Sequence, residues 1–334
     1  MNEPKSQTAQ ATQGSGLGTD NSTHSYIGPG SGFAVLFLLI LFVAYWMYDQ
    51  GRQAFEATDV AAVPAPSADL SGFDPALGYL PDDDMLGFVE IPAGEFLMGS
   101  NPAFDRQAYE NERWSQSQRQ GAVTLPTYYI SRYEVTVAQY QAFLNSTGHS
   151  HVEQALTAPA NHPITNITWT DALAYTRWLQ AMLTENSATP AALRSVLDAG
   201  WLITLPSEAQ WEKSARGSSG AIYPWGIRVR EDAANFNADA TSAVGSFRCT
   251  ACQFGLSDMS GNVWEMTRSP LQPYPYSEDD DMEILGEDAL FVMKGGSFSD
   301  SAANIRAAVR GGVDPGVRSE TIGFRIALSN SNMQ

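Results

Sequence analysis

The chemistry open to this chain starts with its only two cysteines, Cys249 and Cys252, in the segment RCTAC. Thiols at this spacing can form half of a zinc site, a redox pair or a local disulfide. No second cysteine pair completes a zinc site, and His162, the closest histidine, is far away in the sequence. A redox pair normally precedes the helix of a βαβ unit, which the pattern does not predict. A local disulfide in an exported domain is the preferred interpretation, with two buried free thiols as the alternative.

Three histidines, His149, His151 and His162, lie in the part of the chain with a folded-domain composition. His149 and His151 follow a predicted helix end and could bind a metal ion, but no acidic residue lies next to them. We expect surface histidines. A metal site would require both of them to converge with Asp300, which sequence alone does not show.

Charged residues near the C-terminus suggest structural roles. Arg306, Arg310 and Arg325 lie in short apolar segments and are predicted to be buried, bonded to carbonyls or carboxylates. The acidic run 277–289, SEDDDMEILGEDA, does not have the spacing of an EF-hand loop. It is interpreted as a solvated loop, with a partner-binding loop as the alternative. Tryptophans expected in the core are Trp169, Trp211, Trp225 and Trp264.

The elements that position these residues are those of an α+β domain over residues 85–330. Alternating residues in GFVEIPAGEFLMGS predict two short strands around a turn. Helices are predicted after Thr136, ending at Gly148, and across TWTDALAYTRWLQAML. A third has Ser207 and Gln210 at capping-box spacing and ends at Gly217. Short strands and many turns follow from residue 220 onward.

Three segments precede this domain. Residues 1–30 are rich in Ser, Thr, Gln and Gly and are predicted to be a disordered tail. Residues 31–48 contain the uncharged run FAVLFLLILFVAYWMY, which is long enough, when extended, for one transmembrane helix. No basic region precedes it, so a cleavable signal peptide is disfavoured. Residues 49–84 are rich in Pro, Ala and Asp and are predicted to be a linker.

The overall charge argues against nucleic acid as a partner. The 334 residues carry 19 Lys and Arg against 37 Asp and Glu, a net charge of −18. Such a chain repels phosphate backbones, and no local basic cluster offsets the repulsion. Hydrophobic residues make up 43% of the chain, which is enough for a sizeable core.

An ordered series of motifs adds a family resemblance. The series runs through VEIPAGEFLMGS, EVTVAQYQAFLN, HPITNITWTDALAY, LPSEAQWEKSARG, YPWG, ANFN, GLSDMSGNVWEM, KGGSF and IGFRIAL. Together these segments resemble the formylglycine-generating enzyme family, the sulfatase-modifying-factor domain. The resemblance implies a compact α+β fold with little regular structure, related to C-type lectins.

The resemblance also implies an activity for which this chain lacks the expected pair of copper-binding cysteines. Active members oxidise a sulfatase cysteine with Cu(I) held by two thiolates in the segment after the Gly-Gly-Ser-aromatic motif. Here Ser299, Asp300 and Ser301 follow Phe298, and no cysteine occurs after Cys252. Hard oxygen ligands disfavour Cu(I), so no copper is expected. Asp300, at the former active-site position, could bind a cation or a peptide amine, or cap a turn, which is preferred.

Calcium is the cofactor that the resemblance implies. Asp258, Gly261, Val263 and Glu265, in DMSGNVWE, match a family site with two side-chain ligands and two backbone carbonyls. Such oxygen ligands suit Ca²⁺, although the two carboxylates could instead cap turns. A second family site would begin at Asn235, where Asp239 is the only nearby carboxylate in a shortened loop.

These observations suggest a membrane-anchored, non-catalytic domain that binds another protein, as an accessory or assembly subunit of a membrane complex. The alternative is a metal-dependent oxidase or modifying enzyme of altered chemistry in the same fold. The flanking charges Lys5 and Arg52 do not decide the orientation. Calcium and a disulfide would suit an extracytoplasmic domain, held at the inner membrane and periplasmic in a Gram-negative source.

Overall fold

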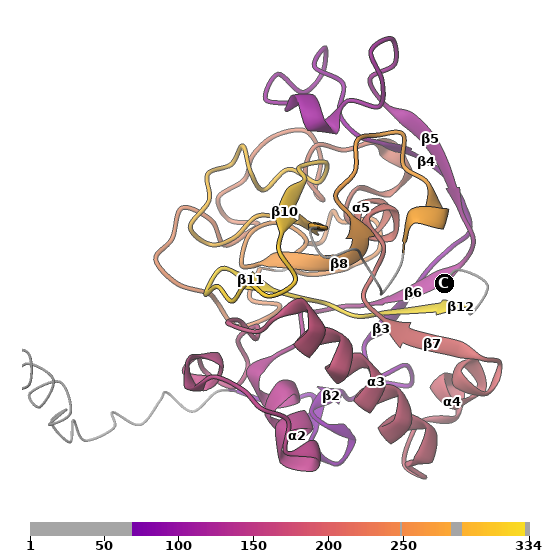
Figure 1. Cartoon of the computed structure of the whole chain (residues 1–334), viewed down its shortest axis with the longest axis vertical. Coiled ribbons are helices and arrows are strands. Elements are labelled where there is room, and N and C mark those ends of the chain that lie inside the picture. The colour runs from indigo at the N-terminus through magenta and orange to yellow at the C-terminus, as the bar shows by residue number, and fades with distance from the viewer. Residues whose placement is uncertain (1–68, 248, 282–288, 331–334) are drawn as a thin grey trace, which may run out of the picture. The chain divides into compact units, whose positions relative to one another are not determined.

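A computed structural model describes residues 69–247, 249–281 and 289–330 (Figure 1). The predicted tail and transmembrane segment lie outside these residues. Within the described part of the chain, no helix combines the length and apolar character needed to cross a membrane.

The folded domain begins earlier than the sequence pattern predicts. The pattern places residues 69–84 in the linker, but they contain β1 (Phe73–Asp74), a short 3₁₀ helix (Pro75–Leu77) and β2 (Leu80–Pro81). Leu77 and Leu80 are buried in the main hydrophobic core. Two isolated leucines in a Pro- and Asp-rich segment show no periodicity, so the pattern could not distinguish this packed edge from a linker. Packed residues therefore occur before the predicted boundary at residue 85.

The helices cover one part of the domain and begin at side-chain caps. They are α2 (Val137–Thr147), α3 (Trp169–Glu185), α4 (Ala191–Asp198) and α5 (Glu208–Arg216). Thr136, Thr168 and Ser207 each close a capping box with the residue three positions later. These boxes satisfy backbone N–H groups that the first helical turn leaves unpaired. The three predicted helices are confirmed, whereas α4 was not predicted.

Two four-stranded sheets organise the strands. One has the order β3 (Phe88–Ile91), β6 (Tyr128–Ser131), β12 (Ala327–Asn330) and β7 (Trp201–Thr204), all antiparallel. The other has the order β10 (Gly311–Val313), β9 (Phe291–Lys294), β8 (Trp264–Pro270) and β11 (Ile322–Gly323), with β11 parallel to β8. A separate antiparallel pair joins β4 (Gly94–Met98) to β5 (Gly121–Leu125).

The layers place α5 at the centre. In Figure 1, α2, α3 and α4 lie below the β3–β6–β12–β7 sheet, and α5 lies above it. α5 also contacts β8, β9, β4 and β5. All nine residues of α5 are buried, which leaves charged side chains such as Glu208 and Glu212 inside the protein. They need buried partners of opposite charge.

A long irregular region separates α5 from β8. Past a 3₁₀ turn (Gly217–Ser219), the described residues up to β8 form turns and isolated bridges rather than helices or strands. The α+β class with limited regular structure is therefore confirmed. An irregular backbone must find hydrogen-bond partners outside regular ladders, and buried polar side chains provide many of them here.

Candidate functional site

The loop that follows β9 is built around Asp300. Its carboxylate accepts hydrogen bonds from the backbone N of Ser297 (3.0 Å), from Ser297 Oγ (2.7 Å) and from Trp264 Nε1 (2.8 Å). A fourth bond comes from Asn304 Nδ2 (2.7 Å). Oδ2 accepts three of these bonds and Oδ1 accepts one, so the carboxylate of Asp300 closes the turn.

A glycine fixes the path of the same loop. Gly296 has φ +72°, and a Cβ there would come within 2.9 Å of the carbonyl oxygen of Asn304. Only glycine fits this close backbone approach. The Gly-Gly-Ser segment thus brings the loop back onto itself and directs Ser297 toward Asp300.

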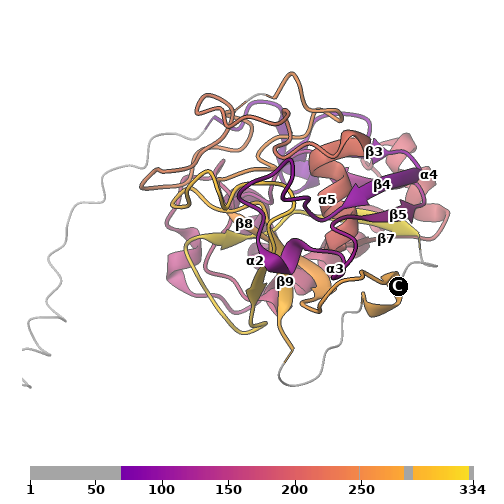
Figure 2. The same ribbon diagram turned by 90° about the horizontal axis from the view of Figure 1, so that it is seen from above.

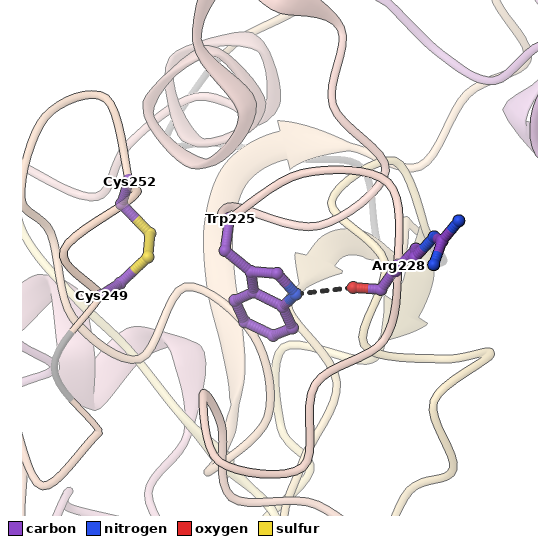
Figure 3. Close-up of a disulfide and its surroundings, with 4 residues drawn as sticks. All are labelled: Trp225, Arg228, Cys249 and Cys252. Carbon is purple, nitrogen blue, oxygen red and sulfur yellow. Dashed lines mark hydrogen bonds between the residues drawn. A yellow bond between two sulfur atoms is a disulfide. The ribbon is translucent and has the colours of Figure 1, made fainter.

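The two cysteines form a disulfide. Cys249 and Cys252 are joined with their Cα atoms 5.3 Å apart, beside the turn that carries Trp225 (Figure 3). The indole Nε1 of Trp225 donates to the carbonyl of Arg228 (2.8 Å), which holds that turn closed. Because the sequence has only two cysteines, the bond leaves no thiol to act as a copper ligand.

The histidines are separated by their partners. His149 Nε2 lies 2.8 Å from Asp171 Oδ1, and His162 Nδ1 lies 2.9 Å from Thr241 Oγ1, while His151 is exposed. In the described part of the chain, no group of three or more His, Cys, Asp or Glu side chains could hold a metal ion. The postulated site of His149, His151 and Asp300 is therefore not formed.

Asp171 connects His149 to the start of α3. Burial raises the pKa of Asp171, but bonds from His149 and Thr168 and the charge of Arg318 outweigh it and lower that pKa overall. Asp171 also completes the Thr168 capping box. The pair is thus a structural device at a helix N-terminus, where negative charge is favourable.

The segment 258–265 lies beside a buried cluster of acidic groups. Asp258, Glu265 and Glu134 are all buried. Arg325 binds Glu265 in a bidentate pair, with Nε at 2.5 Å and Nη2 at 2.6 Å from the two oxygens. Trp211 Nε1 also donates to Glu265 (2.5 Å). Three carboxylates thus share the charge of one guanidinium.

The pKa values of two of these carboxylates are raised in this buried, negatively charged cluster. Burial, followed by the neighbouring carboxylates Asp258 and Glu265, raises the pKa of Glu134 well above its usual range. Burial also raises the pKa of Asp258 to about 6, against the opposing effects of the Gly245 N–H and Arg325. Oδ2 of Asp258 accepts from Gly245 N (2.7 Å), whereas Oδ1 is buried and receives no hydrogen bond from the described residues.

Glu134 was missed as a member of this cluster. Its carboxylate accepts from Asn262 Nδ2 (2.6 Å) and from the backbone N of Val263 (3.3 Å). It therefore ties the start of α2 to the segment 258–265. A glutamate next to a buried valine and a buried helix cap was a usable signal, because an acidic residue there needs a buried partner.

The expected second calcium site is less complete. Asn235 is buried, and its Nδ2 donates to Ala240 O (3.0 Å) and to Asn262 Oδ1 (3.2 Å). Asp239 is exposed. Asn235 thus stabilises the fold of its own loop.

The three predicted structural arginines are buried, as expected. Arg306 pairs with Glu112 (2.7 Å) and Asp105 (2.5 Å), and Arg310 pairs with Glu208 (2.6 Å). Of the four tryptophans, Trp169 and Trp211 are buried, while Trp225 and Trp264 are half-buried. Most of the acidic run 277–289 lies outside the described residues.

Comparison with known proteins identifies the family of this chain. Residues 79–330 match the family described as "Sulfatase-modifying factor enzyme 1-like domain". The chain belongs to this family.

Relatives within this sulfatase-modifying-factor family differ in their named activities. The chain is 27% identical to the hercynine oxygenase of Mycolicibacterium thermoresistibile, over 70% of this chain and 56% of that protein. It is 26% identical to the formylglycine-generating enzyme of Mus musculus, over 72% of this chain and 75% of that protein. It is 28% identical to the "Inactive C-alpha-formylglycine-generating enzyme 2" of Mus musculus, over 76% of this chain and 88% of that protein.

A solved structure supports the fold. PvdO from Pseudomonas aeruginosa superposes with a TM-score of 0.57 at 24% identity, covering 72% of this chain and 93% of that one. The sulfatase-modifying-factor fold therefore extends through the whole region that carries Asp300, the disulfide and the carboxylate cluster. The chain spans only 56% of the hercynine oxygenase.

Proposed function

We propose that this protein is a membrane-anchored, non-catalytic member of the sulfatase-modifying-factor family that binds another protein. It would serve as an accessory or assembly subunit of a membrane complex. The observation that carries the proposal is the loop after β9, where the carboxylate of Asp300 accepts four hydrogen bonds from protein groups. The only cysteines are paired elsewhere, so a thiolate pair for Cu(I) is missing.

A relative named as inactive supports this proposal by analogy, since a chain of this family can carry the fold without the activity. The apolar run in residues 31–48 supports an anchor, and the segment after it would give the domain reach. A domain held at a membrane has a raised effective concentration for a neighbour there. The disulfide supports a location outside the cytoplasm.

We further propose that Ca²⁺ stabilises the segment 258–265. Asp258, Glu265 and the carbonyls of Gly261 and Val263 would hold the ion, which would supply positive charge to the buried cluster. The surplus of carboxylates over Arg325 and the unbonded Oδ1 of Asp258 fit a hard cation. Glu265 is already engaged by Arg325, so Asp258 would be the main side-chain ligand.

The second candidate function is a modifying enzyme of altered chemistry. It is favoured by the names of two relatives, a hercynine oxygenase and a formylglycine-generating enzyme. It requires a catalytic group other than the histidine–aspartate site that the structure does not form.

Two measurements on the full-length protein distinguish the candidates. The first is purification from native membranes in mild detergent with calcium, followed by identification of proteins present in stoichiometric amounts. The second is oxygen consumption with a sulfatase-derived cysteine peptide, with and without Cu(I). A defined complex and no oxygen consumption would support the accessory role. A protein that purifies alone and oxidises the peptide would overturn it.

A further inference from the structure

Exposed apolar side chains gather in one region of the described surface. Of the seven large hydrophobic residues that are exposed on the described surface, five belong to β4 or to two loops near it. These five are Leu97, Phe104, Tyr109, Ile227 and Val229. Phe104 is 81% exposed and Ile227 is 72% exposed. Single exposed apolar residues are ordinary, but a group of them marks an interaction surface.

Three of these side chains surround one hollow, which we call the apolar pocket. It has a volume of about 410 Å³ and is lined by Leu97, Phe104, Ile222 and Ile227 on its apolar side. Ser100, Asn101 and Gln120 add hydrogen-bonding groups. Its size lies within the usual range for ligand sites. Asp300 is not among its lining residues.

Two chain segments form the apolar pocket. The segment between β4 and β5 makes the loops at the top of Figure 1, and this segment faces the viewer in Figure 2. The other segment follows α5 and contains Ile222 and Ile227.

Buried bonds hold both segments in place independently of the exposed side chains. Arg306 Nη1 donates to Asp105 Oδ2 (2.5 Å), and the same guanidinium donates hydrogen bonds to both carboxylate oxygens of Glu112. Arg216 Nη1 donates to Gly99 O (2.7 Å), and Ala307 N donates to Ile222 O (2.8 Å). The pocket is therefore preformed, and the exposed parts of Phe104 and Ile227 contribute little to the fold.

Two exposed arginines directly follow lining residues of the apolar pocket in the sequence, Arg106 after Asp105 and Arg228 after Ile227. No carboxylate of the described residues forms an ion pair with either of them, whereas Glu110 and Asp232 in the same two segments are paired with other arginines. Asp105 and Glu112 are neutralised by Arg306. Two exposed, unpaired cations next to lining residues favour acidic groups on a ligand at this place, although the whole chain has a net charge of −18.

We propose that the apolar pocket docks a segment of a partner protein that presents an aromatic or branched aliphatic side chain between acidic residues. This inference rests on the proposed protein-binding function and names its surface. The apolar side chain enters the hollow between Phe104 and Ile227, and the acidic neighbours face Arg106 and Arg228. A hollow suits an inserted side chain better than a flat lipid surface, and the net charge repels anionic membranes.

The test uses the full-length protein in neutral phosphatidylcholine nanodiscs. The probe is a fluorescein-labelled nonapeptide of glutamates with one central phenylalanine, and binding is followed by anisotropy. Replacing its phenylalanine by alanine should weaken binding by about tenfold or more, since a buried large side chain contributes that much. Replacing its glutamates by lysines should weaken binding by about as much, because like charges would then face Arg106 and Arg228. Binding should also weaken as salt rises.

Matched variants assign the site. Phe104→Ser with Ile227→Ser should lose about tenfold or more in peptide affinity while folding normally, because both side chains are exposed. Val317→Ser, at another exposed apolar residue, should leave affinity unchanged. Equal binding of the alanine peptide, unchanged affinity in the double variant, or binding to anionic vesicles in place of the peptide would overturn the proposal.

Co-purification separates this inference from the proposed function. If a stoichiometric complex co-purifies with the wild type and equally with the double variant, the pocket assignment is wrong and the accessory function stands. If no complex accompanies the wild type, the accessory function itself fails. Loss of the complex in the double variant alone, together with the peptide result, supports both.

Discussion

Asp300 illustrates how a single side chain can close a loop through its hydrogen bonds. The copper cysteines of active family members are expected in this loop, yet here one carboxylate receives four hydrogen bonds. The carboxylate oxygens accept these bonds from groups of the loop and from the indole of Trp264. The chemistry of a position therefore depends on the hydrogen bonds that the group already makes as well as on the type of group.

Removing this carboxylate should destabilise the loop. Asp300→Ala leaves Trp264 Nε1 and Ser297 N without their acceptor, so we expect a loss of about 1–3 kcal/mol in the free energy of unfolding. Asp300→Asn keeps one acceptor oxygen and should lose less. Chemical denaturation of the full-length protein measures both, and Asp239→Ala, at an exposed position, is the control. Equal stability of all three variants would show that Asp300 is not a structural group.

The buried carboxylates should make stability depend on pH and calcium. The pKa of Asp258 is about 6 in the folded protein, above its unfolded value of about 3.9, so the folded state binds the proton more tightly. The associated stability is present below about pH 4 and is lost as the pH rises through about 6. In EDTA, Asp258→Asn should flatten this decline by about 1–3 kcal/mol.

Calcium should act on the same group. At pH 7.5 it should raise the melting temperature of the wild type, and it should have much less effect on Asp258→Asn. Burial also raises the pKa of Asp281 to about 6. Asp281 is present in both the wild type and Asp258→Asn, so its effect on stability cancels when the two proteins are compared at one pH. A calcium response that is identical in the two proteins would place the ion elsewhere.

At the scale of elements, buried ion pairs take the place of regular hydrogen-bond ladders. Arg306 joins the segment between β4 and β5 to the loop after β9, and Arg310 joins that loop to α5. The partners of Arg306 are about 200 residues away in sequence, with separations of 194 and 201. Each pair fixes two irregular segments at once.

Breaking such a pair should cost far more than breaking one at the surface. Arg306→Ala leaves Glu112 and Asp105 as unpaired buried carboxylates, and we expect a loss of about 3–5 kcal/mol. The exposed pair of Arg230 with Asp232 is the matched control, and Arg230→Ala should cost less than about 1 kcal/mol. Limited proteolysis would also show earlier cleavage between β4 and β5 in the Arg306 variant. Similar unfolding curves for the two variants would contradict this account.

The pattern of success in the sequence predictions follows from the range of the interactions. The helices after Thr136 and Ser207 were predicted correctly because a capping box and a terminal glycine are local signals. The buried state of the three arginines was also predictable from their apolar neighbours. Their partners were not, since Glu112 and Glu208 are brought to them only by the tertiary fold. Glu134 differs, because its position beside a valine and a helix cap was a local signal that its carboxylate would be buried.

At the scale of the whole molecule, the charge is unevenly distributed. The chain is strongly acidic, yet Arg106 and Arg228, which follow lining residues of the apolar pocket in the sequence, have no carboxylate partners among the described residues. A domain fixed at a membrane would diffuse over a small region, so a pocket of modest affinity could still be occupied by a neighbour. The proposed anchor and the proposed docking surface therefore support one function.

The compartment of the domain provides the last test, because its only two thiols report on it. If the domain lies outside the cytoplasm, Cys249 and Cys252 should be fully oxidised in intact cells, and alkylation before reduction should label neither. A variant lacking residues 31–48 should stay in the cytoplasm with both thiols reduced. The disulfide closes a loop of only four residues, so its loss should cost about 2 kcal/mol or less, and the variant should still fold. Reduced thiols in the wild type would reverse the proposed orientation, because reducing conditions persist on the cytoplasmic side of the membrane.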